Sequence, residues 1–225
     1  MMPMRRAVVV AVAVVLAGGT ALAQTPSAPV VTTAAPQAPA PGAAEKTWSF
    51  YASAYTYILS DRRDYVQPTL AADRGWLHLE GRFNYEDLDT GSAWFGYNFS
   101  VGETLALEVT PIVGAVFGNT TGIAPGYKAS LSWRSLELSS ETEYVFDTTD
   151  SAGSFLYTWL ELAWAPVEWC RVGMVVQRTK AYQTEFDIQR GVLVGVSYKR
   201  ADVTAYVLNP DASRPTGVVA VGLRF

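Results

Sequence analysis

The last ten residues of the chain, 216–225, constrain its fold more than any other segment. Their side chains alternate in the manner of a β-strand, in which successive side chains point to opposite faces. One face consists of Val219, Val221, Leu223 and Phe225. This apolar face continues to the final residue, so the segment predicts a closing strand that has an apolar environment on one side.

The first residues have the pattern of a secretory signal peptide. Arg5 and Arg6 precede an uninterrupted apolar run at 7–17, and the sequence Ala-Leu-Ala at 21–23 has the small-x-small form of a cleavage site. We therefore expect a signal peptide over 1–23. An uncleaved membrane anchor is the alternative, but the apolar run is shorter than the roughly 17–25 residues that a transmembrane helix needs.

Residues 24–47 are expected to form a linker in the periplasm. The segment up to residue 44 is rich in Ala, Pro, Thr and Val and contains no charged residue. A segment of this composition cannot bury enough apolar surface to offset the entropy lost on ordering, so we expect it to be extended and disordered.

From residue 48 to residue 225 the chain divides into short alternating runs separated by polar, Gly-rich or Pro-rich clusters. The twelve runs are Trp48–Leu59, Tyr65–Ala72, Trp76–Glu86, Ser92–Val101, Leu105–Phe117, Tyr127–Trp133, Leu136–Phe146, Phe155–Ala165, Cys170–Thr179, Phe186–Lys199, Asp202–Leu208 and Thr216–Phe225. Short and longer connections alternate between them, and the longer ones include 118–126 and 180–185. This pattern predicts an all-β, antiparallel barrel of twelve strands. Ten strands is the alternative, if the run containing Pro68 and one other run are loops.

The two faces of the runs differ in polarity. In the run 136–146, Leu138 and Tyr144 share one face, whereas Glu141 and Glu143 share the other. A soluble barrel would have an apolar interior, but acids at mid-strand opposite a continuous apolar face predict a polar interior and an apolar exterior. Outward aromatics are expected at one end at Phe99, Trp133, Trp164, Tyr198 and Phe225, and at the other end at Tyr85, Phe117, Tyr127, Tyr144 and Phe146.

In its terminal Phe225, its aromatic positions and its alternating connections, the segment 48–225 resembles the outer-membrane β-barrels of Gram-negative bacteria. The resemblance implies export through the periplasm, location in the outer membrane, and contact with membrane lipid and lipopolysaccharide. It also implies that Phe225 forms part of a signal for the barrel-assembly machinery. The resemblance concerns architecture, and it assigns no functional residue of a particular family.

Charged side chains are expected to line the interior of the barrel. The acids are Glu80, Glu86, Glu108, Glu137, Glu141, Glu143 and Glu161, and the bases are Arg82, Lys128, Arg171, Lys199 and Arg224, with His78 beside them. Two interpretations stay open. These groups line a narrow pore that prefers cations because acids are in excess, or they pair with one another and fill a barrel without a transport task.

Other functions have less support in the sequence. The net charge of −4 and the absence of a basic patch do not suggest a nucleic-acid partner. His78 is the only His and Cys170 the only Cys, so no cofactor and no metal site built on several Cys or His is expected. An enzyme acting on membrane lipid remains the least favoured alternative, because His78 is expected to face the interior, away from the lipid.

Overall fold

The computed structural model of the chain describes residues 47–60, 63–179 and 187–225. The expected signal peptide, the linker up to residue 46 and the connection at 180–185 lie outside these residues. The strands are β1 (Ser49–Ile58), β2 (Tyr65–Arg74), β3 (Leu77–Phe83), β4 (Thr90–Tyr97), β5 (Phe99–Val101), β6 (Leu105–Gly118), β7 (Gly122–Trp133), β8 (Leu136–Asp147), β9 (Phe155–Val167), β10 (Cys170–Thr179), β11 (Asp187–Tyr198), β12 (Ala201–Leu208) and β13 (Thr216–Arg224). A short 3-10 helix, η1 (Ser151–Gly153), precedes β9. In the part of the chain that is described, no helix has the length and apolarity required to cross a membrane.

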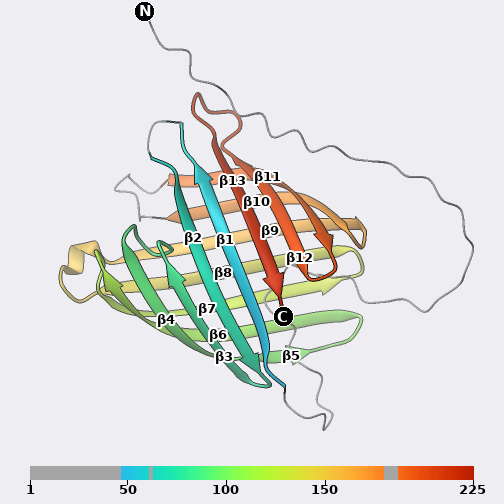
Figure 1. Ribbon diagram of the computed structural model, residues 1–225, viewed down its shortest axis with the longest axis horizontal. Coiled ribbons are helices and arrows are strands. Elements are labelled where there is room, and N and C mark those ends of the chain that lie inside the picture. Colours follow the sequence, from blue (N-terminus) through green and yellow to red (C-terminus); the bar gives the residue numbers. More distant parts are fainter. Residues whose placement is uncertain (1–46, 61–62, 180–186) are drawn as a thin grey trace, which may run out of the picture.

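The strands form a closed antiparallel barrel. Neighbours in the chain pair with one another, β1 pairs with β13 from Tyr51↔Arg224 to Ile58↔Gly217, and β4 pairs with β6. The first and last strands therefore lie side by side (Figure 1). The short β5 follows β4 after Asn98 and pairs with β6 beyond the part of β6 that pairs with β4. The barrel therefore has twelve strands around its circumference and one additional short strand.

The expected count of twelve strands is confirmed, and the alternative of ten is wrong. The run containing Pro68 forms β2, in which Pro68 pairs with Ala54 of β1. The lengths of the connections also follow the expected alternation, except for the short connection between β6 and β7. Short turns occupy 75–76, 134–135, 168–169 and 199–200, whereas longer segments occupy 59–64, 84–89, 148–154 and 209–215. Short turns and longer loops therefore lie at opposite ends of the barrel.

The outer surface of the barrel is apolar. Leu105, Val113 and Phe117 of β6 are about half exposed, and so are the rings of Trp133 and Trp164 near the short turns. Side chains on the alternate positions of the same strands point inward and are mostly buried. The expected division into an apolar exterior and an interior that carries the charged side chains is thus present in the fold.

The connection between β6 and β7 is shorter than expected, because β7 begins at Gly122 and leaves only 119–121 as a turn. The prediction of a loop over 118–126 is therefore wrong, and Tyr127 lies within β7 rather than at its outer end. Small residues permit close strand approach here: a Cβ atom added at Gly126 would lie 2.5 Å from the carbonyl oxygen of Thr142 on β8. The glycines and the proline that suggest a loop in the sequence are part of a strand.

The prediction that Tyr85 faces outward is also wrong. β3 ends at Phe83, and Asn84 adopts a positive φ of 57°, which breaks the alternation of side chains. Tyr85 therefore turns into the lumen, where its hydroxyl donates a hydrogen bond of 3.0 Å to Glu141. Lys199 is a second exception, because it lies in the exposed turn after β11 with its Nζ atom 5.2 Å from the centre of the Tyr198 ring.

Candidate functional site in the barrel lumen

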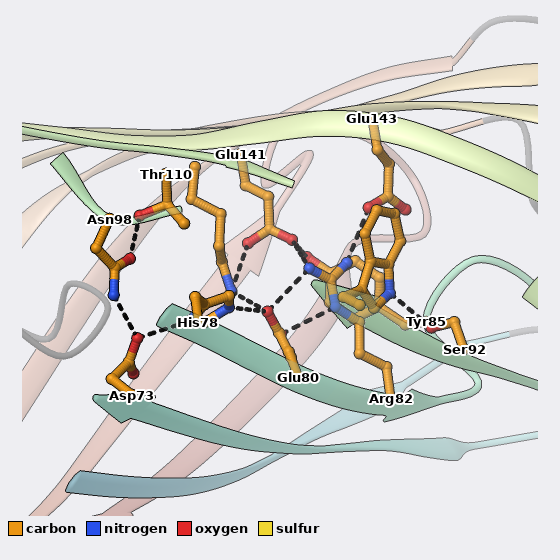
Figure 2. Close-up of polar contacts among 12 residues, drawn as sticks. Asp73, His78, Glu80, Arg82, Tyr85, Ser92, Asn98, Thr110, Glu141 and Glu143 are labelled. Carbon is orange, nitrogen blue, oxygen red and sulfur yellow. Dashed lines mark hydrogen bonds and ion pairs between the residues drawn. The ribbon is translucent and has the colours of Figure 1, made fainter. Parts of the chain in front are cut away.

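Arg82 forms the centre of a charged cluster that crosses the lumen. Its side chain is fully buried, and it extends from β3 toward β8, four strands away around the barrel. The guanidinium group lies 2.9 Å from Glu80, 2.8 Å from Glu141 and 2.8 Å from Glu143 (Figure 2). The rings of Tyr85 and Trp94 lie against the guanidinium group, with centres 4.3 and 4.5 Å from its carbon. The planar guanidinium group of an arginine suits this environment, because it can donate hydrogen bonds to several carboxylates and pack against aromatic rings.

His78 joins one further acid, Asp73, to this cluster. Its Nδ1 atom lies 2.9 Å from Asp73, and its Nε2 atom lies 3.1 Å from Glu80. Both ring nitrogens can donate to these carboxylates at once only when the ring carries two protons. Asp73 also accepts a hydrogen bond of 2.7 Å from Asn98, which in turn accepts one from Thr110 (Figure 2). The polar network therefore extends from the start of β3 to β6.

Lys128 of β7 supplies the second fixed positive charge of the cluster. Its Nζ atom lies 2.6 Å from Glu80 and 3.6 Å from Glu141. The acids of the cluster are Asp73, Glu80, Glu86, Glu141 and Glu143. They outnumber Arg82 and Lys128, and a protonated His78 would not balance the difference. The middle of the lumen therefore has an excess of negative charge when these acids are ionised.

Three of these acids have a buried oxygen that is not satisfied within the described residues. Glu86, in the connection after β3, accepts hydrogen bonds from Ser92 (2.6 Å) and from the indole of Trp94 (3.3 Å). Among the described residues its other carboxylate oxygen has no hydrogen-bond partner, and the same holds for one oxygen of Glu143 and one of Asp73. Burial raises the pKa of the Glu86 carboxyl, because the charged form loses its hydration.

A second cluster surrounds Glu161 on β9. Its carboxylate accepts hydrogen bonds from Arg171 (2.9 Å), from the indole of Trp159 (2.8 Å) and from the hydroxyl of Tyr206 (2.8 Å). Arg171 also donates to Thr204 of β12. All of these groups come from the wall formed by β9–β12. Glu161 and Arg171 therefore form an acid–base pair that is separate from the cluster around Arg82.

Each of the twelve barrel strands contributes a buried side chain to the interior of the barrel. We call this set the lumen plug: Tyr57, Gln67, Arg82, Trp94, Val116, Ala124, Val145, Tyr157, Val175, Leu193, Leu208 and Val218. None of them is more than 4% exposed, and all except Gln67 and Arg82 belong to one contiguous apolar cluster. Most lie in the half of the strand that leads to the longer connections. A water-filled passage along any of these strands would expose its plug residue, whereas none of these side chains is more than 4% exposed.

A cavity lies on the other side of the plug, toward the short turns. This lumen chamber has a volume of about 130 Å³. Its lining includes Tyr51, Tyr55, Glu108, Lys128, Glu141, Trp159, Glu161, Arg171, Asp202 and Tyr206. A neighbouring cavity of about 120 Å³ shares Tyr55, Lys128 and Glu141 with it and reaches His78 and Glu80. Charged side chains therefore border both of these small cavities.

Glu108 and Glu137 differ from the other acids that the sequence suggests for the lumen. Both are partly exposed and lie on the inner face of β6 and β8. Among the described residues no basic group lies within 4 Å of either carboxylate, whereas Glu80, Glu141, Glu143 and Glu161 all have such a neighbour. Two acids without an ion-pair partner among the described residues thus lie toward the end of the barrel that has the short turns.

Sequence reasoning did not identify the aromatic and aliphatic part of the lumen. Tyr57, Tyr157 and Leu208 point inward, although the interior was expected to be charged. The alternation itself contained this information, because Tyr157 and Trp159 share the inward face with Glu161. The number and volume of these side chains, in addition to their charge, decide whether the lumen is open.

Comparison with known proteins supports the barrel fold. No protein-family model and no curated protein matches the sequence. Among solved structures, the KdgM porin has a TM-score of 0.52 at 11% identity, covering 78% of this chain and 99% of that chain. The KdgM porin in complex with disordered oligogalacturonate matches with a TM-score of 0.52 at 10% identity, covering 78% and 99%. The outer membrane protein Omp33 of Acinetobacter baumannii matches over 81% of this chain and 100% of that chain at 8% identity, but its TM-score of 0.46 is too low to support an argument. The architecture expected from the sequence, an outer-membrane type of β-barrel, is confirmed.

Proposed function

We propose that the chain is an outer-membrane β-barrel whose lumen is closed to free passage of solutes at rest. A closed barrel leaves no strand edge unpaired, which is the condition for β-structure in a bilayer. The apolar exterior and the exposed aromatic rings near both ends supply the surface that lipid requires. We further propose that the chain is exported through the periplasm and contacts lipid and lipopolysaccharide.

The lumen plug is the observation that carries the proposal of a closed lumen. Each barrel strand contributes at least one inward side chain that is at most 4% exposed. Ions cross a membrane protein through a hydrated path, and a packed apolar cluster excludes water. Conduction would therefore require the plug to rearrange.

Conductance in a planar bilayer tests this proposal. The purified barrel, checked for folding by heat-modifiable gel mobility, is expected to give no steady current at low voltage. Replacing the two buried side chains Trp94 and Val145 with Gly is expected to produce a current in the same assay, because their removal opens the plug. A steady current from the unaltered barrel would contradict the proposal.

A narrow cation-preferring pore is the second candidate, and the excess of acids in the cluster favours it. A small conductance that appears when voltage opens the plug should select cations, because fixed negative charges attract them within about a Debye length. The oligogalacturonate of the KdgM complex is a chain of carboxylated sugars. The acids of this lumen would repel such a chain, so we do not extend that ligand to this protein.

Replacement of Glu141 with Gln separates the two candidates. In a conducting barrel, Glu141→Gln should shift the reversal potential toward lower cation preference. Glu168→Gln is the matched control, because Glu168 is exposed in a short turn outside the lumen. Loss of stability without any conductance in either protein would exclude the pore and leave a structural or partner-binding barrel.

A further inference from the structure

The lumen chamber is bordered by an acid that has one unsatisfied carboxylate oxygen. Asp202, near the start of β12, is only 6% exposed, and its Oδ1 atom accepts no hydrogen bond. No ion pair joins Asp202 to a described residue. Leaving a buried carboxylate oxygen without a donor is costly, so a ligand with a positive charge and an N–H group would be stabilised there.

A glycine makes room for this acid. A Cβ atom added at Gly222 would lie 2.4 Å from the hydroxyl of Tyr51 and 2.6 Å from the Oδ2 atom of Asp202. Any larger residue at position 222 would push both groups away. The side chains of Tyr51 and Asp202 thus lie together at the wall of the chamber, where both are part of its lining.

A second acid without a basic neighbour among the described residues borders the chamber from the opposite wall. Glu108 lies on β6, which is six strands from β12 in either direction around the barrel. No basic group of the described residues lies within 4 Å of Glu108. Of the positive groups that border the chamber, Arg171 forms an ion pair with Glu161 and Lys128 forms one with Glu80, and the four acids of its lining (Glu108, Glu141, Glu161 and Asp202) outnumber these two bases. The chamber can therefore accept additional positive charge from either side.

The remaining walls favour an organic cation. The rings of Tyr55, Trp159 and Tyr206 line the chamber, and aromatic faces attract cations that have apolar surface. In the described part of the chain, no three His, Cys, Asp or Glu side chains converge as they would around a metal ion. The volume of about 130 Å³ is close to the roughly 150 Å³ cavity that holds benzene, which has six heavy atoms.

We propose that the lumen chamber binds a small primary alkylammonium ion, with Asp202 as its main acceptor and Glu108 as the second. Diaminobutane, with six heavy atoms and an ammonium group at each end, has the charge, the donors and the size that the chamber requires. The proposal goes beyond the function proposed above, because binding in the chamber does not require any ion to cross the plug.

Calorimetric titration of the folded, detergent-solubilised barrel tests this proposal. Diaminobutane is expected to bind with measurable heat at millimolar concentration. Two ligands of similar size are the controls: butanediol lacks the charge, and tetramethylammonium lacks the N–H donors, so both should bind about tenfold more weakly or not at all. Absence of heat with diaminobutane, or equal binding of butanediol, would overturn the proposal.

Variants assign the site within the barrel. Asp202→Asn is expected to weaken diaminobutane binding about tenfold, and Glu108→Gln is expected to weaken it less. Glu168→Gln removes the same charge from an exposed turn and should leave the affinity unchanged. Heat-modifiable mobility identifies any variant that does not fold. If Asp202→Asn does not fold, the Glu108→Gln result decides, and unaltered affinity in the folded acid variants would overturn the assignment. Since this assay measures no conductance, its outcome is independent of the outcome in the planar bilayer.

Discussion

At the scale of single residues, Arg82 holds the two walls of the lumen together. Its guanidinium group connects Glu80 on its own strand to Glu141 and Glu143 on β8. Each of these carboxylates would lose hydration on burial, and Arg82 is the positive charge that all three share, with Lys128 as a second one beside Glu80 and Glu141. The cluster is consequently stable only as a unit, and removal of its central cation should affect every acid in it.

Replacing Arg82 with Met tests this dependence. Arg82→Met keeps much of the side-chain volume but leaves buried acids uncompensated, so we expect a loss of about 3–5 kcal/mol in the free energy of unfolding. Unfolding of the barrel in lipid vesicles by guanidinium chloride, followed by tryptophan fluorescence, measures this loss of free energy. Arg190→Met is the control, because Arg190 pairs with Asp211 at side-chain exposures of 72% and 62% and exposed pairs contribute little. Equal effects of the two changes would contradict the central role of Arg82.

The residues of the candidate site could be predicted only in part. Alternation from Leu77 to Phe83 suffices to place His78, Glu80 and Arg82 on one face of β3, where the structure has them. It fails at Tyr85, because the positive φ of Asn84 reverses the face and no residue pattern marks that change. Pairing partners could not be predicted either, since the distance between Arg82 and Glu143 depends on how β3 and β8 curve around the lumen.

At the scale of elements, the β1–β13 pair closes the barrel. Beyond the end of β13, Phe225 exchanges two backbone hydrogen bonds with Phe50, at 2.9 and 3.0 Å. The two rings stack with centres 5.8 Å apart. Phe225 therefore has a structural role in this seam in addition to the role in assembly that its resemblance to a recognition signal suggests.

Two changes at Phe225 separate these roles. Deletion of Phe225 removes the backbone pairing and the ring, and we expect less folded barrel in cells, measured by heat-modifiable mobility. Phe225→Ala retains the backbone pairing, so the purified variant should still refold in vesicles while its insertion in cells falls. Phe99→Ala, which removes another exposed aromatic ring, is the control. Normal insertion of the deletion variant in cells would refute the assembly role.

The strands differ in how well the sequence indicates them. β6 and β8 have long alternating runs, and their faces follow from residue type alone. The start of β7 does not, because Gly122, Pro125 and Gly126 have the composition of a loop. At Gly122 and Gly126 the backbone of β8 lies so close to β7 that only small residues fit. Pairing with β8 thus outweighs the local preference of these residues for a turn.

At the scale of the whole molecule, the sequence defines the barrel but does not define whether it is open. Twelve strands give a backbone radius of roughly 12 Å by the spacing and tilt typical of barrels. Whether inward side chains fill that space depends on how far they extend from opposite walls. Tyr55 of β1 and Trp159 of β9 meet with ring centres 6.1 Å apart across the lumen, a contact that follows from closure of the sheet.

The orientation of the barrel follows from the position of its ends, and surface labelling tests it. Because the chain enters β1 and leaves β13 at the end with the short turns, we expect that end to face the periplasm and the longer loops to face outward. Cys170 is first replaced with Ser so that the native thiol does not react. A single Cys for labelling is then introduced as Ser213→Cys in the exposed connection 209–215. Gly122, which the sequence places in a loop, is unsuitable because its Cβ position lies 2.0 Å from the carbonyl oxygen of Phe146.

A membrane-impermeant maleimide should label Ser213→Cys in intact cells. Glu103→Cys, exposed in the turn 102–104 at the opposite end, should react only after the outer membrane is permeabilised. The pair is informative because both positions are exposed and differ mainly in the side of the membrane that they face. A closed lumen adds a second expectation: the reagent cannot reach Glu103→Cys through the barrel, so the difference between the two positions should be sharp. Labelling of Glu103→Cys alone in intact cells would reverse the orientation.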